Sequence, residues 1–175
     1  VPLPGESAGL VWDLERWSRT SIGSVAMGHE ILATSLQVAL ATAVFANGGT
    51  LPVPRLILWK DRPGEGRVSE PTETPRRVIE PQTAITMRRM MEEVVLDGTG
   101  QRARLAGYSS GGKTGSAQIY EPEEGHYTDE YNSSFAGFAP VQDPKIVVSV
   151  TLNGATEYGG VVAAPVFREV VTETL

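Results

Sequence analysis

The stretch that most constrains the fold is Ser110–Gln118, which holds three glycines, three hydroxyl side chains and one lysine. No helix-forming sequence flanks it and residues 113–120 show no helical period, so we expect a strand there that ends before Pro122. Glycines let a ligand approach the backbone closely. A lysine beside small hydroxyl groups can hold a carboxylate or a phosphate. This strand is therefore the first candidate for a binding surface.

Two helices are predicted ahead of this strand. Residues 34–37 read Thr-Ser-Leu-Gln, a capping box in which the side chains of Thr34 and Gln37 satisfy each other's backbone N–H groups. Apolar residues follow at helical spacing, and Asn47-Gly48-Gly49 supplies a left-handed stop. The second helix is expected to begin at Pro81, where a first-turn proline belongs, and to end at Asp97-Gly98.

Residues 51–80 lie between these helices and contain five prolines. The segment Val53–Trp59 is too apolar and too rich in strand-forming residues for a disordered linker. A turn at Asp61–Gly66 followed by Arg-Val-Ser predicts a short surface hairpin in this segment.

Two more strands and a helix are predicted after the glycine-rich strand. We expect an acidic loop at Glu121–Glu130, a short strand at Ser134–Phe138, and a strand at Lys145–Leu152 so apolar that both its faces should be buried. A final helix follows Gly159-Gly160, with five side chains expected to face inward: Val162, Val166, Phe167, Val170 and Val171. The predicted fold class is α+β, with three antiparallel strands packed with helices in one domain over residues 1–175.

The composition excludes several function classes. The 175 residues carry a formal net charge of −6 and contain no Lys/Arg cluster, so neither nucleic acid nor an anionic membrane is an expected partner. Because the chain has no cysteine, disulfides, zinc–thiolate sites and cysteine nucleophiles are excluded. The acidic stretch 121–130 lacks the ligand spacing of known metal sites, so we expect no metal there.

Three motifs overlap on Lys113. Residues Gly107–Thr114 match the phosphate-binding pattern G-x-x-x-x-G-K-[ST], but that loop requires a buried strand before it and a helix after it. Neither flank fits, which argues against nucleotide binding. Ser110 and Lys113 could form a nucleophile–base pair only on a helical turn, which the glycines between them disfavour.

The third motif, Lys113-Thr114-Gly115, suits a strand. Alternation places Lys113 and Gly115 on one face and Thr114 and Ser116 on the other. The missing side chain of Gly115 is expected to leave room for a substrate backbone. Lys-Thr-Gly is the strand motif of penicillin-recognising serine enzymes.

Further motifs in the same order make the chain resemble the C-terminal part of the transpeptidase domain of a class B penicillin-binding protein, a peptidoglycan D,D-transpeptidase. They are Leu3-Pro4-Gly5-Glu6, Thr34–Gln37, Ala46-Asn47-Gly48-Gly49, Gly98-Thr99-Gly100, Gly112–Gln118, Phe135–Pro140 and Ala164–Phe167. Ser35 replaces the proline that is usual at its position. The Ser21–Asn47 segment resembles division-type members more than elongation-type members.

The resemblance implies a role for each matching residue. Lys113 would assist proton transfer and attract the terminal carboxylate of the substrate, which the hydroxyls of Thr114 and Ser116 would bind beside Gly115. The backbone N–H of Ser116 would form half of an oxyanion hole. Tyr131 and Tyr158 match positions of aromatic groups beside the site, and ordinary packing explains both tyrosines equally well.

The family's Ser-x-x-Lys helix and Ser-x-Asn loop have no counterpart in the sequence. We therefore expect the nucleophile to precede Val1 and this chain to be an inactive fragment. Its strand Lys145–Leu152 would then have a free edge through which the fragment could dimerise. A non-catalytic peptidoglycan-binding or regulatory module is the second interpretation.

The resemblance also implies what the whole enzyme does. It would cross-link stem peptides through an acyl-serine without a cofactor, and β-lactams would inhibit it. It would work beside cell-wall glycosyltransferase and division proteins, on the outer face of the bacterial inner membrane, anchored by an upstream helix.

Overall fold

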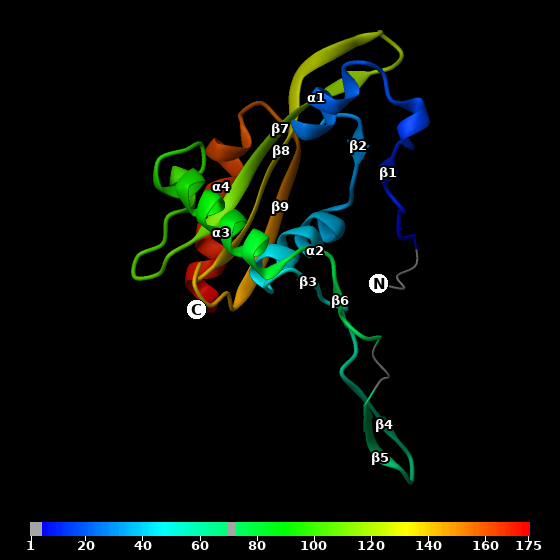
Figure 1. The fold of residues 1–175 in the computed structure, drawn as a ribbon, viewed down its shortest axis with the longest axis vertical. Coiled ribbons are helices and arrows are strands. Elements are labelled where there is room, and N and C mark those ends of the chain that lie inside the picture. Colours follow the sequence, from blue (N-terminus) through cyan, green and yellow to red (C-terminus); the bar gives the residue numbers. More distant parts are fainter. Residues whose placement is uncertain (1–4, 70–72) are drawn as a thin grey trace.

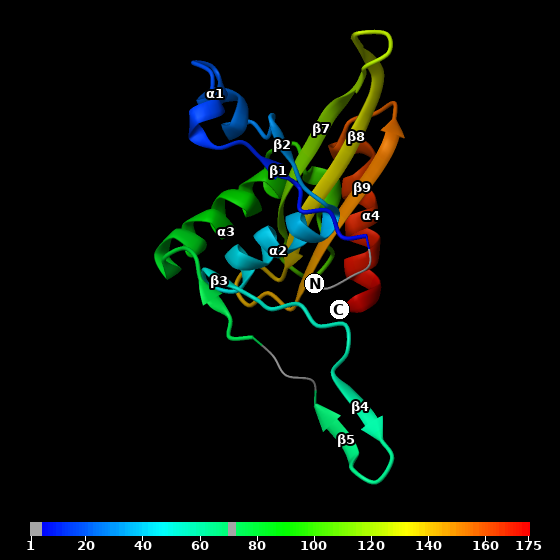
Figure 2. The same cartoon turned by 90° about the vertical axis from the view of Figure 1, so that its right-hand side faces the viewer.

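A computed structural model describes residues 5–69 and 73–175, and its centre is a three-stranded antiparallel sheet. The strands are β7 (Gly111–Glu121), β8 (His126–Ala139) and β9 (Ile146–Ala155), in the order β7-β8-β9. Figures 1 and 2 show helix α4 (Gly159–Thr174) on one face, and α2 (Ser35–Ala46) with α3 (Pro81–Leu96) on the other. This arrangement confirms the predicted α+β class. Residues Leu3, Pro4 and Pro71, used in the sequence patterns, lie outside the described part.

Local signals define the ends of α2 and α3 as predicted. Thr34 Oγ1 accepts from the Gln37 N–H at 3.2 Å, and Gln37 Oε1 accepts from the Thr34 N–H at 2.9 Å. At the other end, Gly49 has φ +93° and its N–H donates to the Val44 carbonyl at 2.8 Å. Helix α3 starts with Pro81 in its first turn and is capped by Asp97.

The hairpin between β7 and β8 is longer than predicted. Of the stretch expected to be an acidic loop, Glu121 belongs to β7 and residues 126–130 belong to β8, so only residues 122–125 form the turn. Cross-strand contacts account for the extension: the rings of Tyr120 and Tyr127 meet edge-on at 5.2 Å, and Thr128 Oγ1 donates to the Ile119 carbonyl. Aromatic cross-strand pairs of this kind stabilise hairpins.

Helix α4 does not bury the predicted set of valines. Val166 and Val170 are 38% and 42% exposed, whereas Ala163 and Ala164 are fully buried with Phe167 and Val171. The alanines and Gly159 let the helix axis approach the sheet closely, whereas Val166 and Val170 lie on the outer face.

The core has one part on each face of the sheet. On the α4 face, Phe135 packs against Phe167 with ring centroids 4.8 Å apart. On the other face, Met91, Phe138 and Val141 form a second cluster. Strand β9 contributes to both parts, as predicted. Its residues 146–150 stay only half-buried, because β9 is an edge strand of the described sheet and pairs with β8 alone.

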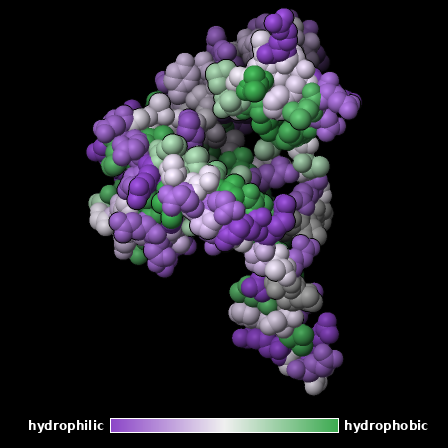
Figure 3. Space-filling model, viewed as in Figure 1, coloured by the Kyte–Doolittle hydropathy of each residue, from purple (hydrophilic) through white to green (hydrophobic). Residues whose placement is uncertain are grey.

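The remaining elements form extensions from this body. They are β1 (Leu10–Val11) with β2 (Ile31–Leu32), the 3-10 helix η1 (Leu14–Arg16), α1 (Ser21–Ala26), β3 (Thr50–Leu51) with β6 (Arg76–Arg77), and the hairpin β4 (Trp59–Arg62) and β5 (Gly66–Ser69). The hairpin was predicted and projects far from the sheet (Figures 1 and 2). Hydrophobic side chains are visible on it and near α1 (Figure 3). Among the described residues, no helix is long and apolar enough to cross a membrane.

Candidate active site

Successive side-chain positions of strand β7 face α3 and α4 alternately. A Cβ added at Gly111 would lie 3.2 Å from the Glu92 nitrogen of α3, whereas one at Gly112 would lie 2.4 Å from the Phe135 ring in the α4-side core. Continuing this alternation places Lys113 and Gly115 on the α3 side, and Thr114 with Ser116 on the α4 side. The predicted separation of the four positions is confirmed.

Thr114 and Ser116 lie against the beginning of α4. The Gly159 N–H donates to Ser116 Oγ at 3.0 Å. The oxygens Thr114 Oγ1 and Thr99 Oγ1 are 2.7 Å apart, within hydrogen-bond distance. This close approach requires glycine at position 159, because a Cβ there would lie 2.2 Å from the Ser134 carbonyl oxygen and 2.4 Å from that of Gly115.

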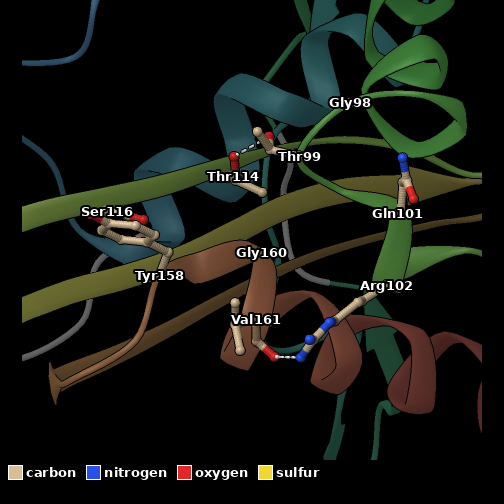
Figure 4. Close-up of a pocket in the computed structure, with 9 residues that line it drawn as sticks. All are labelled: Gly98, Thr99, Gln101, Arg102, Thr114, Ser116, Tyr158, Gly160 and Val161. Carbon is tan, nitrogen blue, oxygen red and sulfur yellow. Dashed lines mark hydrogen bonds between the residues drawn. The ribbon is translucent and has the colours of Figure 1, made fainter.

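A hollow of about 620 Å³ opens beside these hydroxyl groups, between β7, the loop after α3, and the first turn of α4 (Figure 4). Six of its nine lining residues carry polar side-chain groups, although most of the exposed lining surface is apolar: Gly98, Thr99, Gln101, Arg102, Thr114, Ser116, Tyr158, Gly160 and Val161. A hollow with several convergent donors and an arginine suits an anionic ligand.

Lys113 is exposed at the edge of β7. Its Nζ donates to the Thr114 carbonyl at 2.9 Å and lies 3.4 Å from Thr114 Oγ1. The role expected of Gly115, to leave room for a substrate backbone, stays a prediction. A Cβ there would lie 2.4 Å from Ser134 Oγ, so the missing side chain makes room for the serine of β8, and Gly115 does not line the hollow.

The two tyrosines contact each other. Their rings meet edge-on with centroids 5.1 Å apart. Tyr158, the N-cap of α4, is 59% exposed and lines the hollow, whereas Tyr131 lies on β8 opposite Gln118 and does not. Side-chain hydrogen bonding with Tyr158 raises the pKa of Tyr131 above its ordinary value, and burial adds to the shift.

The two rejected motifs have no suitable geometry. Ser110 is 4% exposed and its Oγ donates to the Ala103 carbonyl at 3.0 Å, so it is not presented as a nucleophile. The residues that would cradle a phosphate, Gly111–Thr114, belong to β7, which continues to Glu121 without any helix. The structure therefore removes the phosphate-loop interpretation.

The sequence interpretation missed the wall of the hollow opposite β7. Thr99, Gln101 and Arg102 come from the loop after α3 and the 3-10 helix η2 (Gln101–Ala103), and Arg102 Nη1 donates to the Val161 carbonyl of α4 at 3.2 Å. The sequence signal for this wall is the Gly98-Thr99-Gly100 motif, which belongs to the family resemblance but predicts no role for its threonine. Its proximity to β7 depends on tertiary packing.

Comparison with known proteins finds relatives that match almost the whole chain. The family model for the penicillin-binding protein transpeptidase domain matches residues 1–172. Penicillin-binding protein PbpB of Mycolicibacterium smegmatis is 38% identical over 98% of this chain, and stage V sporulation protein D of Bacillus subtilis is 34% identical over all of it. The chain spans 28% of the length of each of these two relatives.

Solved structures agree with this result. The crystal structure of penicillin-binding protein 3 from Mycobacterium tuberculosis in complex with aztreonam matches 99% of this chain with a TM-score of 0.91 and 35% identity, over 42% of its own chain. The transpeptidase domain of penicillin-binding protein 3 from Burkholderia pseudomallei matches all of it with a TM-score of 0.81 and 32% identity, over 51% of its own chain. The chain thus belongs to the transpeptidase family of class B penicillin-binding proteins.

Proposed function

We propose that this chain forms the carboxylate-binding and oxyanion-binding wall of a peptidoglycan D,D-transpeptidase. The observation that carries the proposal is the placement of Lys113, Thr114 and Ser116 along one edge strand, where the two hydroxyl residues, but not the lysine, line a hollow of about 620 Å³. Two hydroxyl groups on one face of the strand, with Lys113 Nζ 3.4 Å from Thr114 Oγ1, suit the terminal carboxylate of a stem peptide ending in D-Ala-D-Ala. The aztreonam complex of the similar mycobacterial structure supports a β-lactam ligand.

The reaction we propose is acyl transfer through a serine of the longer protein. The serine oxygen attacks the carbonyl of the penultimate D-alanine, its proton passes to the leaving amine, and the terminal D-alanine departs. An amine of a second stem peptide then attacks the acyl-serine carbonyl. The acyl C–O bond breaks, the amine proton returns to the serine oxygen, and the new amide bond is the cross-link. A β-lactam acylates the same serine when its ring C–N bond breaks and the ring nitrogen takes the proton.

The edge position of β7 supports an oxyanion role for Ser116. In an antiparallel pair, alternate residues direct both N–H and C=O away from the partner strand. The Thr114 carbonyl accepts from Lys113 Nζ at 2.9 Å, which places it on the open edge, and Ser116 has the same parity. A Ser116 N–H on that edge could donate to a developing oxyanion, an interaction whose loss costs about 10²–10³-fold in rate.

The proposal also covers the place of this chain in the longer protein. We place residues 1–175 at the C-terminal end of one transpeptidase domain, with the nucleophile and the Ser-x-Asn loop in chain that precedes Val1. Tyr158 would contact the substrate and Tyr131 would support it, given that only Tyr158 lines the hollow. The intact protein would act outside the cytoplasm, in division-type wall synthesis. The open edge of β9 would let the isolated chain dimerise.

Acylation by a fluorescent penicillin tests the proposal. The longer protein should be labelled, and Lys113→Ala should slow its acylation by about 10²–10⁴-fold, the range for losing a group that assists proton transfer. Lys145→Ala is the matched control, because that exposed lysine pairs with Asp143 far from the hollow and should leave labelling unchanged. An unlabelled longer protein, or equal labelling of the Lys113→Ala variant, would refute the proposal. Labelling of the isolated chain would refute the missing-nucleophile account.

A further inference from the structure

Thr99 is the one residue in the hollow whose side-chain oxygen contacts that of Thr114. The two hydroxyl oxygens are 2.7 Å apart, and either of them could donate. The backbone of Thr99 is held on both sides: the N–H of the next residue, Gly100, donates to the Val94 carbonyl at 2.9 Å, and a Cβ at Gly160 would lie 2.4 Å from the Thr99 carbonyl oxygen. Thr99 is therefore fixed between the end of α3 and the start of α4.

The hydroxyl of Thr114 has one proton and two acceptor positions. Lys113 Nζ, which can only donate, lies 3.4 Å from Thr114 Oγ1 and can fill one acceptor position. A carboxylate in the hollow can only accept. The arrangement that fits these limits is one in which Thr99 donates to Thr114 Oγ1 and Thr114 donates to the carboxylate. Hydrogen bonds in such a chain strengthen one another.

Ser116 provides an internal comparison. Its Oγ accepts from the Gly159 N–H at 3.0 Å, and a backbone N–H can never accept, so the Ser116 proton remains free for a ligand. Thr99 would do for Thr114 what Gly159 does for Ser116. In both cases a donor on the α4 side of the strand occupies an acceptor position and leaves the proton available to the hollow.

We infer that Thr99 is a positioning residue that donates to Thr114 Oγ1 and thereby turns the Thr114 proton toward the substrate carboxylate. The inference rests on the proposed function, because it assumes that Thr114 binds a carboxylate. It adds a residue outside the Lys-Thr-Gly strand to the recognition of that group, and it acts through Thr114 without touching the ligand.

The test compares variants of the longer protein for acylation by a penicillin and by the methyl ester of the same penicillin. Thr99→Val keeps the shape and removes the hydroxyl, and Thr99→Ser keeps the hydroxyl. We expect Thr99→Val to slow acylation by the free acid about three- to tenfold, the range for one neutral hydrogen bond. Thr99→Ser should restore it, and acylation by the ester should be unchanged. In a Thr114→Val background, Thr99→Val should have no further effect.

Three results would overturn the inference. Equal slowing with acid and ester would indicate a structural role only. Additive effects of Thr99→Val and Thr114→Val would mean that Thr99 contacts the ligand itself. Unchanged acylation of Thr99→Val, with an unchanged melting temperature, would mean no role. If Thr99→Val fails to fold, Thr99→Ala is tested against the same acid and ester. Absence of acylation in the unmutated protein would instead overturn the proposed function, so the two failures are distinguishable.

Discussion

Gly159 at the start of α4 gives the sharpest stability prediction. In Gly159→Ala the new Cβ would lie 2.2 Å from the Ser134 carbonyl oxygen, 2.4 Å from that of Gly115 and 2.8 Å from the Ser134 nitrogen. All three atoms are backbone atoms of paired strands, so the helix has to move. Overpacking of a close contact costs about 1–3 kcal/mol, and we expect the upper half of that range. At about 2–4 °C per kcal/mol for a chain of this size, the melting temperature should fall by about 4–12 °C.

A matched glycine in another helix predicts the opposite sign. Gly23 lies in α1, and a Cβ there would meet no atom within 4 Å. Gly23→Ala should therefore stabilise the protein by up to about 1 kcal/mol, the helix preference of alanine over glycine. Thermal and urea unfolding followed by far-ultraviolet circular dichroism measure both variants. If Gly159→Ala melts at or above the unmutated protein, the close contact of α4 with the sheet is not as described.

Two further predictions concern the core and the tyrosine pair. Phe167→Ala removes a fully buried ring and should cost about 3–5 kcal/mol in urea unfolding. Val166→Ala, on the exposed side of the same helix, should stay within about 0.5 kcal/mol, and equal losses would contradict the assigned faces. Tyr158→Phe should lower the pKa of Tyr131 toward its ordinary value, measured by ultraviolet titration. Because the folded-state pKa is raised, the contribution of Tyr131 to stability is present below pH ~10 and is lost as pH rises through the raised value.

How much of the fold could be predicted depended on whether the interactions are local. The limits of α2 were predictable because its capping box and glycine stop act within a few residues of each end. The outer half of the β7–β8 hairpin was not, because its polar residues resemble a loop and are held in strands by cross-strand partners such as Tyr120 and Tyr127. In α4 the spacing of apolar residues predicted that valines would face the sheet. The helix approaches the sheet so closely that the smaller Ala163 and Ala164 are buried there.

The residues of the candidate site also differ in whether local sequence was enough to predict them. Lys113, Thr114 and Ser116 lie within four consecutive residues, and strand alternation alone was enough to separate their faces. The opposite wall, with Thr99 and Arg102, joins them only because α3 and α4 pack on opposite faces of one sheet. The contact between Gly115 and Ser134 could not be predicted for a related reason, since Ser134 is nineteen residues away in sequence but opposite Gly115 in register.

Small residues therefore determine this site as much as the lysine does. Gly159 and Gly160 let the first turn of α4 come close enough for the Gly159 N–H to reach Ser116 Oγ, and for Gly160 to contact Thr99. A larger residue at either position would separate the hydroxyl groups of β7 from the donors that orient them. In this chain the Lys-Thr-Gly strand is therefore combined with a later glycine pair that brings a helix onto the same strand. Gly159→Ala should accordingly weaken carboxylate recognition as well as stability, whereas Gly23→Ala should change stability alone.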